Sequence, residues 1–172
     1  MKDTPHMTAQ TFVPTPENER HFRDALGCFA TGVTIVTVPT ADGPLGMTAN
    51  SFSSVSLDPP LILWCPARNS ERHPHFAGAS HFAIHMLRDD QSTLAMEFAR
   101  NGDPFANQPY QTNPHGVPLI DNCLARLECS THAVHNGGDH DIVVGKVERL
   151  WIDHGAPLVF AQSNFGRFLP NA

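Results

Sequence analysis

Small, hydroxyl-bearing and amide side chains are concentrated between residues 46 and 60, where they separate two apolar segments. Glycine and alanine let backbone N–H groups approach a ligand, and hydroxyl and amide groups can hold a phosphate through hydrogen bonds alone. Serine and asparagine are also common in turns between strands, because their side chains bond to nearby backbone groups. Composition alone favours such a turn. The residues that would bind an anionic or planar ligand here are Thr48, Ala49, Asn50 and Ser51.

A second group of polar side chains follows the apolar run 61–65. The segment 67–73 offers two arginines, the amide of Asn69 and the hydroxyl of Ser70. Loops that follow core strands often contact ligands, because a rigid scaffold positions them. For any one of these residues, a solvated loop explains the composition equally well.

One histidine, His140, follows a glycine-rich turn and is flanked by Asp139 and Asp141. On spacing alone, a lone histidine is more often a surface residue or a satisfied core residue than a catalyst. Near the end of the chain, Arg167 could meet a phosphate and Phe165 an aromatic ring. The same two residues suit a terminal edge strand equally well.

Length and composition indicate one globular domain. The chain has 172 residues, of which 41% are apolar and 16% are charged, so it is long enough to bury a core. We expect a flexible tail over residues 1–15 and a single domain over 16–172. The net charge of -6 argues against nucleic-acid binding, which needs clustered Lys and Arg. No apolar run approaches the ~20 residues of a membrane span.

The chain begins without the apolar core of a secretory signal, so we expect a cytoplasmic protein. The cysteines Cys28, Cys65, Cys123 and Cys129 are scattered and include no Cys-x-x-Cys pair. We therefore expect reduced, buried thiols rather than a disulfide framework or a zinc site.

The predicted elements are mostly strands. A helix should begin with Thr15 as N-cap and Pro16 at its first position, bury an apolar face that includes Phe22 and Leu26, and end by Gly32. A second helix should follow Asp89. Alternating or continuous apolar runs predict strands at 33–38, 46–50, 61–65, 81–87, 124–130, 141–150 and 157–160. The Asn136–Asp139 segment predicts a hairpin turn.

Segment 101–118 is polar and rich in turn residues, which predicts an irregular surface excursion. Its aromatic residues favour a lid or a wall of a substrate site over disorder. Many strands joined by short turns, with helices that do not alternate with them, predict a mainly β fold. An antiparallel Greek-key-type barrel with peripheral helices is the natural closure, because closing a sheet removes its exposed edges.

Five segments, taken in order, resemble the flavin reductase-like family, the short-chain reductase components of two-component flavin monooxygenases. They are FRDALG (22–27), FATGVTIVT (29–37), GMTANSF (46–52), SVSLDPPL (54–61) and GDH (138–140). The resemblance extends over residues 22–168. It implies an FMN-binding split β-barrel that forms a homodimer with flavin at the subunit interface.

The resemblance also implies an activity, in which NADH or NADPH reduces FMN or FAD and the reduced flavin reaches a monooxygenase. Thr48, Asn50 and Ser51, helped by Asn69 and Ser70, would bind the ribityl chain and phosphate. Backbone groups near Ala49 and Ala83 would face the flavin ring. His140 would position the nicotinamide, while Arg167 and Phe165 would contact the dinucleotide. Where many family members carry Asn, this chain has His85, so no role is transferred to that position.

Two other functions fit the sequence. A flavin-binding electron carrier or sensor would share the flavin loops and differ in lacking turnover with a nicotinamide cofactor. The eleven histidines also allow a metal-dependent enzyme, with His73 and His75 or His132 and His135 as ligand pairs. A strand would place residues i and i+2 on one face. No recognised ligand motif supports a metal site, and neither G-x-S-x-G nor G-x-G-x-x-G is present.

Overall fold

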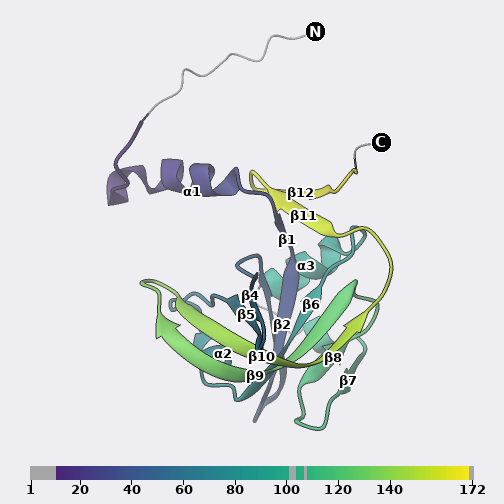
Figure 1. Ribbon diagram of the computed structural model, residues 1–172. Coiled ribbons are helices and arrows are strands. Elements are labelled where there is room, and N and C mark those ends of the chain that lie inside the picture. The colour runs from purple at the N-terminus through teal and green to yellow at the C-terminus, as the bar shows by residue number, and fades with distance from the viewer. Residues whose placement is uncertain (1–10, 101–103, 107, 171–172) are drawn as a thin grey trace.

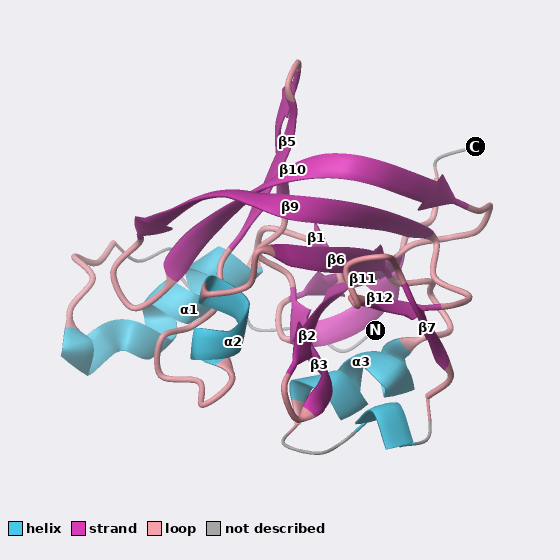
Figure 2. Cartoon of the chain, turned by 90° about the horizontal axis from the view of Figure 1, so that it is seen from below, coloured by secondary structure: helices cyan, strands magenta, loops and turns pink. Residues whose placement is uncertain are grey.

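A seven-stranded antiparallel sheet forms the body of the protein in the computed structural model, which describes residues 11–100, 104–106 and 108–170. Most of the tail predicted for residues 1–15 therefore lies outside the described residues. The sheet is strongly curved, and the long strands β9 and β10 run at a steep angle to β2 and β3 (Figure 2). In sheet order, the strands are β3 (Gly43–Ala49), β2 (Thr34–Thr40), β6 (His81–Met86), β9 (Ala125–Asn136), β10 (Asp141–Ile152), β5 (Pro60–Trp64) and β4 (Ser53–Leu57).

The two ends of this sheet are joined by a side chain. The Ser51 hydroxyl, just after β3, accepts a hydrogen bond from the Cys65 N–H at 2.9 Å and donates to the Cys65 carbonyl at 3.2 Å. Cys65 directly follows β5, so the segment after β3 is held against the far side of the sheet. Strand pairing among the described residues does not itself complete a ring.

Two small sheets complete the β structure. One contains β1 (Thr31–Gly32), β11 (Leu158–Ala161) and β12 (Asn164–Arg167), and the other contains β7 (Tyr110–Thr112) and β8 (Pro118–Ile120). The prediction of a mainly β chain is confirmed. Every predicted strand is present, with ends shifted by a few residues, and the predicted turn joins β9 to β10.

The helices are short and lie outside the sheet. They are η1 (Pro16–Asn18), α1 (Glu19–Gly27), α2 (His73–Ala77), α3 (Ser92–Ala99) and η2 (Pro104–Ala106). Among the described helices, none is long and apolar enough to cross a membrane. Because 73–75 is helical rather than extended, His73 and His75 do not share the strand face assumed for a metal-ligand pair.

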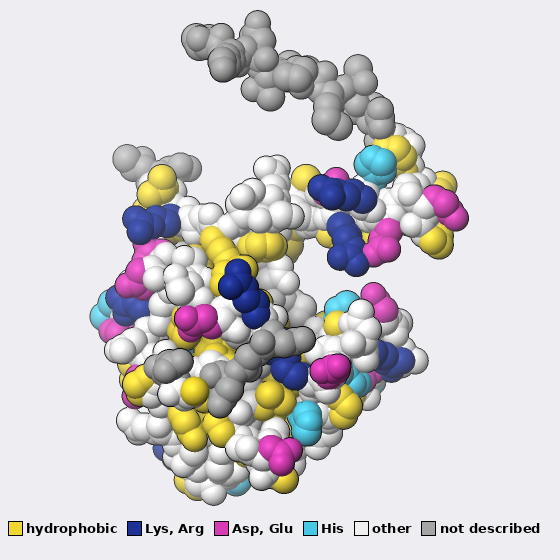
Figure 3. All heavy atoms as spheres, turned by 180° about the vertical axis from the view of Figure 1, so that it is seen from behind, with side chains coloured by type: hydrophobic (Ala, Val, Ile, Leu, Met, Phe, Trp, Pro, Cys, Tyr) yellow, Lys and Arg dark blue, Asp and Glu magenta, His cyan; other side chains and the backbone are white. Residues whose placement is uncertain are grey.

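The first helix corrects the prediction in two ways. It ends at Gly27 instead of continuing toward Gly32, and none of its residues is buried. Its apolar side chains, Phe22 and Leu26, are 47% and 58% exposed. In Figures 1 and 3, α1 projects from the body of the protein as a separate arm. Its apolar face therefore lacks a partner within the described part of the chain.

Besides a small cluster of Ala83, Val117 and Leu119, the core contains two large clusters. Trp64, Phe76 and Phe82 dominate one, and Ile35, Leu87 and Phe98 belong to the other. The four cysteines are free, as predicted. Cys123 and Cys129 are buried, whereas Cys28 is exposed on the isolated first helix, contrary to expectation.

The segment 101–118 was predicted to be an irregular excursion, but its described residues include β7 and the chain leading into β8. This hairpin covers the face of β2 and β6. The Thr37 hydroxyl donates to the Pro118 carbonyl at 2.6 Å, and Val117 and Leu119 pack on Ala83. The hairpin therefore completes the core, and the lid or substrate wall expected of this segment stays a prediction.

His85 forms the central polar contact beneath this hairpin. Its Nδ1 lies 3.0 Å from the Ile35 carbonyl, and its Nε2 accepts a hydrogen bond from the Ile120 N–H at 3.0 Å. A neutral ring, with the proton on Nδ1, satisfies both contacts. Burial lowers the pKa of His85 from 6.5 to about 3. The residue is a structural bridge between β6, β2 and β8.

This depressed pKa predicts a loss of stability in mild acid. Below pH 6.5 the unfolded chain takes up a proton at His85 that the folded chain excludes until about pH 3, so stability falls across that window. Between pH 7.5 and 5.0, urea unfolding should show wild-type protein losing about 2 kcal/mol more than His85→Gln, which cannot titrate. Equal losses in the two proteins would contradict this assignment.

Candidate flavin site

The Thr48–Ser51 segment leaves β3 at the end of the sheet, and its side chains are largely occupied by the protein itself. The Thr48 hydroxyl donates to the Ala95 carbonyl of α3 at 2.6 Å. The Ala49 carbonyl accepts a bond from the Thr34 hydroxyl at 2.7 Å. With Ser51 bonded to Cys65, Asn50 is the exposed member of the predicted set. The hydroxyls therefore fix the shape of this segment.

An apolar pocket of about 270 Å³ opens beside Asn50. Its walls come from the start of β2, the segment after β3, the end of β6 and the start of β11. An apolar cleft with a few polar groups at its rim is the usual form of a site for a planar cofactor. The lining residues are Gly32, Val33, Thr34, Asn50, Phe52, Met86, Leu87, Leu124, Pro157 and Leu158.

The loop after β5, which carries Asn69 and Ser70, is tied to β3 and α3. Asn69 is exposed, and the half-buried Ser70 hydroxyl lies 3.3 Å from the Arg72 N–H, which donates to it. The Arg72 guanidinium donates to the carbonyls of Gly46 and Phe98, each at 2.9 Å. Only glycine fits at position 46, because a Cβ there would overlap the Phe98 ring. The two predicted phosphate-binding segments are thus held together.

His140 lies beside the same loop. It forms an isolated bridge with Ala67, and the Arg68 N–H donates to the Asp139 carbonyl at 2.9 Å. The His140 side chain is 42% exposed, with Nδ1 2.8 Å from an Asp139 carboxylate oxygen. Hydrogen bonding to His140 lowers the pKa of Asp139. The hairpin therefore presents a partly exposed imidazole next to the Asn69–Ser70 loop.

A buried carboxylate, Asp141, fixes this junction, and sequence reasoning assigned it no role. It accepts bonds from the Arg68 guanidinium and lies 2.8 Å from His73 Nε2. The Arg68 hydrogen bond, followed by the His73 contact, holds the pKa of Asp141 below its usual range. The residue after His140 is thereby clamped between the loop and α2. Its position beside His140 was the available signal, but its partners are 73 and 68 residues away.

Three predicted site residues lie elsewhere. Ala83 is fully buried in β6 between β2 and β9, so the structure does not bring it to the Thr48–Ser51 segment. Phe165 packs against Phe160, with ring centroids 5.5 Å apart. The backbone of Arg167 pairs with that of Leu158, which lines the apolar pocket. The Arg167 side chain forms an ion pair with Asp89, with Nε 3.2 Å from a carboxylate oxygen.

Comparison with known proteins identifies the family. The family model described as "Flavin reductase like domain" matches residues 26–168. The chain is also 55% identical over 157 residues to "FMN reductase (NADH) SmoA" of Agrobacterium fabrum, covering 91% of this chain and 90% of that protein. This chain belongs to the flavin reductase-like family. The family resemblance of the sequence is thereby confirmed.

Two further relatives extend the comparison. The reductase component of the flavin-dependent trigonelline monooxygenase of Acinetobacter baylyi is 49% identical to this chain over 133 residues. The match covers 76% of this chain but only 43% of that longer protein. A solved structure of the NADH:FAD oxidoreductase SgcE6 of Streptomyces globisporus, in complex with NAD and FAD fragments, gives a TM-score of 0.87. The two sequences are 36% identical, and the match covers 94% of this chain and 99% of the SgcE6 chain. The split-barrel fold expected of a flavin reductase is therefore confirmed.

Proposed function

We propose that this chain is an NADH-dependent flavin reductase that supplies reduced flavin to a partner monooxygenase. The observation that carries the proposal is the meeting of three segments at one end of the sheet: Thr48–Ser51, Asn69–Ser70 and the hairpin with His140. The names of the relatives support NADH as reductant and a monooxygenase as the consumer of the product. They include both FMN and FAD, and either flavin remains compatible with the site.

The residues present fit a flavin. The apolar pocket beside Asn50 suits a planar ring, and the exposed amides of Asn50 and Asn69 can donate to a ribityl chain or phosphate. When bound, the flavin supplies the chemistry by accepting a hydride at N5 from the nicotinamide. The protein needs to orient the two rings and exclude water, which accounts for the absence of a triad from the sequence. His140 would position the nicotinamide.

The homodimer implied by the family resemblance would give α1 a partner. The arm exposes Phe22 and Leu26, and Phe29 just beyond it is 78% exposed. Exposed apolar residues are also present on strands β4 and β10, with Leu57 at 96% and Ile152 at 72%. An apolar helix face that is left exposed in this way is typical of a protein interface. A second copy of the chain is the occupant that we propose, and its flavin would lie at the subunit interface.

The test is an assay of the purified protein, whose visible spectrum is recorded first. Oxidation of NADH and of NADPH is then followed with FMN, with FAD and without added flavin. Turnover with NADH that requires added flavin supports the proposal. Turnover by a yellow protein alone would mean a retained cofactor. Bound flavin without oxidation of either nucleotide would favour an electron carrier or sensor, and no flavin binding would overturn the proposal.

A further inference from the structure

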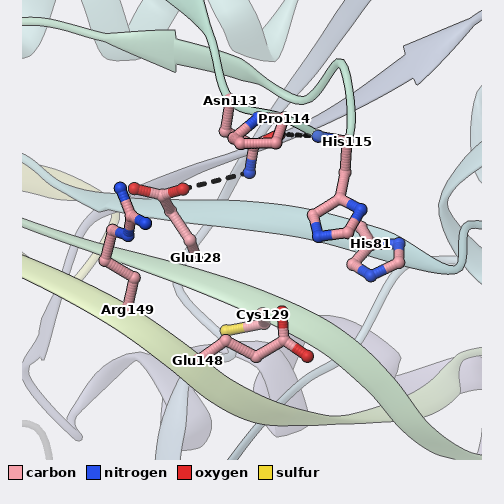
Figure 4. A pocket seen from close by; sticks show the side chains of 8 residues that line it. All are labelled: His81, Asn113, Pro114, His115, Glu128, Cys129, Glu148 and Arg149. Atoms are coloured by element: carbon pink, nitrogen blue, oxygen red, sulfur yellow. Dashed lines mark hydrogen bonds between the residues drawn. The ribbon is translucent and has the colours of Figure 1, made fainter.

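Two histidines and a glutamate converge at a pocket beside the turn between β7 and β8 (Figure 4). His81 begins β6, His115 lies in the turn between β7 and β8, and Glu148 lies at an irregularity in the β9–β10 pairing. One potential ligand atom from each residue lies within 4.8 Å of the other two. They line a pocket of about 110 Å³. Neither histidine belongs to the pairs considered from the sequence.

The turn that carries His115 is anchored on the sheet. The Asn113 carboxamide oxygen accepts bonds from the N–H groups of His115 and Val117 at 2.9 and 3.0 Å. The same carboxamide donates to Glu128 of β9 at 3.0 Å. These contacts place His115 over His81, and the two rings stack with centroids 3.8 Å apart and planes 8° apart. The pair is therefore built into the fold of the hairpin.

We propose that His81, His115 and Glu148 form a binding site for a divalent transition metal such as Zn²⁺. Neutral imidazole and carboxylate are common zinc ligands, and three protein ligands leave a fourth position for water. His81 Nδ1 lies 3.1 Å from the Ser80 hydroxyl, which leaves Nε2 for the ion. A second hydrogen bond of this kind orients the ring of a metal-binding histidine.

The other potential ligands at the pocket are buried or bonded to neighbouring side chains. Cys129 is only 2% exposed and packs in a core cluster, so its sulfur is not presented to an ion at the surface. Glu128 is bonded to Asn113 and lies 3.9 Å from the Arg126 guanidinium. Glu148, by contrast, is exposed beside the two rings. The remaining donor set is therefore two imidazoles and one carboxylate.

Binding requires one local movement. Two parallel rings cannot both direct an in-plane lone pair at a single ion, so one ring must turn. His115 is exposed and can rotate about its side-chain bonds, whereas His81 is half-buried in the strand. The ion would then link the β7–β8 turn to β6 and β10. The site lies at the opposite end of β6 from Met86, which lines the apolar pocket, so it is separate from the flavin site.

The test measures Zn²⁺ binding to tag-free, chelator-washed protein by calorimetry and by competition with a chromophoric chelator. All proteins carry Cys28→Ser, which removes an exposed thiol that could bind zinc. We expect one site per chain that is weakened at least tenfold in His115→Gln and in Glu148→Gln. The matched control is His132→Gln, because His132 is also exposed on the sheet but lies outside the cluster.

The two substituted ligands are exposed, so circular dichroism and flavin reduction without metal should match those of the parent protein. The control should bind Zn²⁺ as the parent does. Retention of full affinity in both His115→Gln and Glu148→Gln, or failure of the parent protein to bind micromolar Zn²⁺, would overturn the site. Neither result would bear on the flavin reductase proposal.

Discussion

His140→Ala should raise the Michaelis constant for NADH about tenfold while leaving the dissociation constant for flavin within about twofold. The imidazole is partly exposed, and its Nδ1 is held by Asp139, so its other edge is available to a second ligand. Loss of one polar contact of about 1.4 kcal/mol corresponds to a factor of ten. Flavin contacts come from the Thr48–Ser51 and Asn69–Ser70 segments, which the substitution leaves intact. Steady-state kinetics and fluorescence titration measure the two constants.

His135→Ala is the matched control, since His135 lies on the same hairpin, is exposed and belongs to no proposed contact. Its kinetic constants should stay near those of wild type. Asp139→Asn should raise the Michaelis constant for NADH less than His140→Ala does, because the imidazole remains but loses a charged partner. If His140→Ala weakened flavin binding as much as nicotinamide binding, the residue would have to be assigned to the shape of the loop.

The sequence predicted strands well where their apolar pattern is local. Residues 33–38 are all β-branched, and the first five residues of the corresponding strand β2 are buried. Strand β4 was missed because Ser53–Leu57 contains three serines and is mostly exposed, so it reads as part of a turn. Helix α2 was missed because Pro74 and two histidines hide its short amphipathic pattern. Strand β4 pairs with β5, the next strand along the chain, whereas α2 buries Phe76 among residues of strands that are distant in sequence.

At the candidate site too, local sequence patterns could be predicted, whereas contacts between distant residues could not. Segments 46–51 and 67–73 could be recognised because their polar residues are contiguous, and the family resemblance supplied His140. The ties between the segments could not be predicted, since Arg72 reaches Gly46 and Phe98 across 26 residues in each direction. The packing of the β7–β8 hairpin on Ala83 could not be predicted, because alternation along a strand does not say which face a separate hairpin will cover.

Removing the Arg72 guanidinium should destabilise the protein strongly. Arg72 donates to Gly46 of β3 and to Phe98 and Ala99 at the end of α3, where a cation also meets the negative end of the helix dipole. Burial lowers the pKa of Arg72, yet a guanidinium stays charged at neutral pH. In Arg72→Met these carbonyls lose a charged donor and remain partly buried, which should cost about 3 kcal/mol in urea unfolding.

Two further variants separate this role from the loss of charge alone. Arg72→Lys keeps the charge but not the planar fork, so it should recover only part of the stability. Arg23→Met removes an arginine from a surface ion pair, in which the Arg23 side chain is 76% exposed and that of Glu19 is 59% exposed. This substitution should change the free energy of unfolding by less than about 0.5 kcal/mol. Arg72→Met should also weaken flavin binding at low temperature, where the protein stays folded, because the Asn69–Ser70 loop loses its tether to β3. A stability within 0.5 kcal/mol of wild type for Arg72→Met would show that water replaces the guanidinium at all three carbonyls.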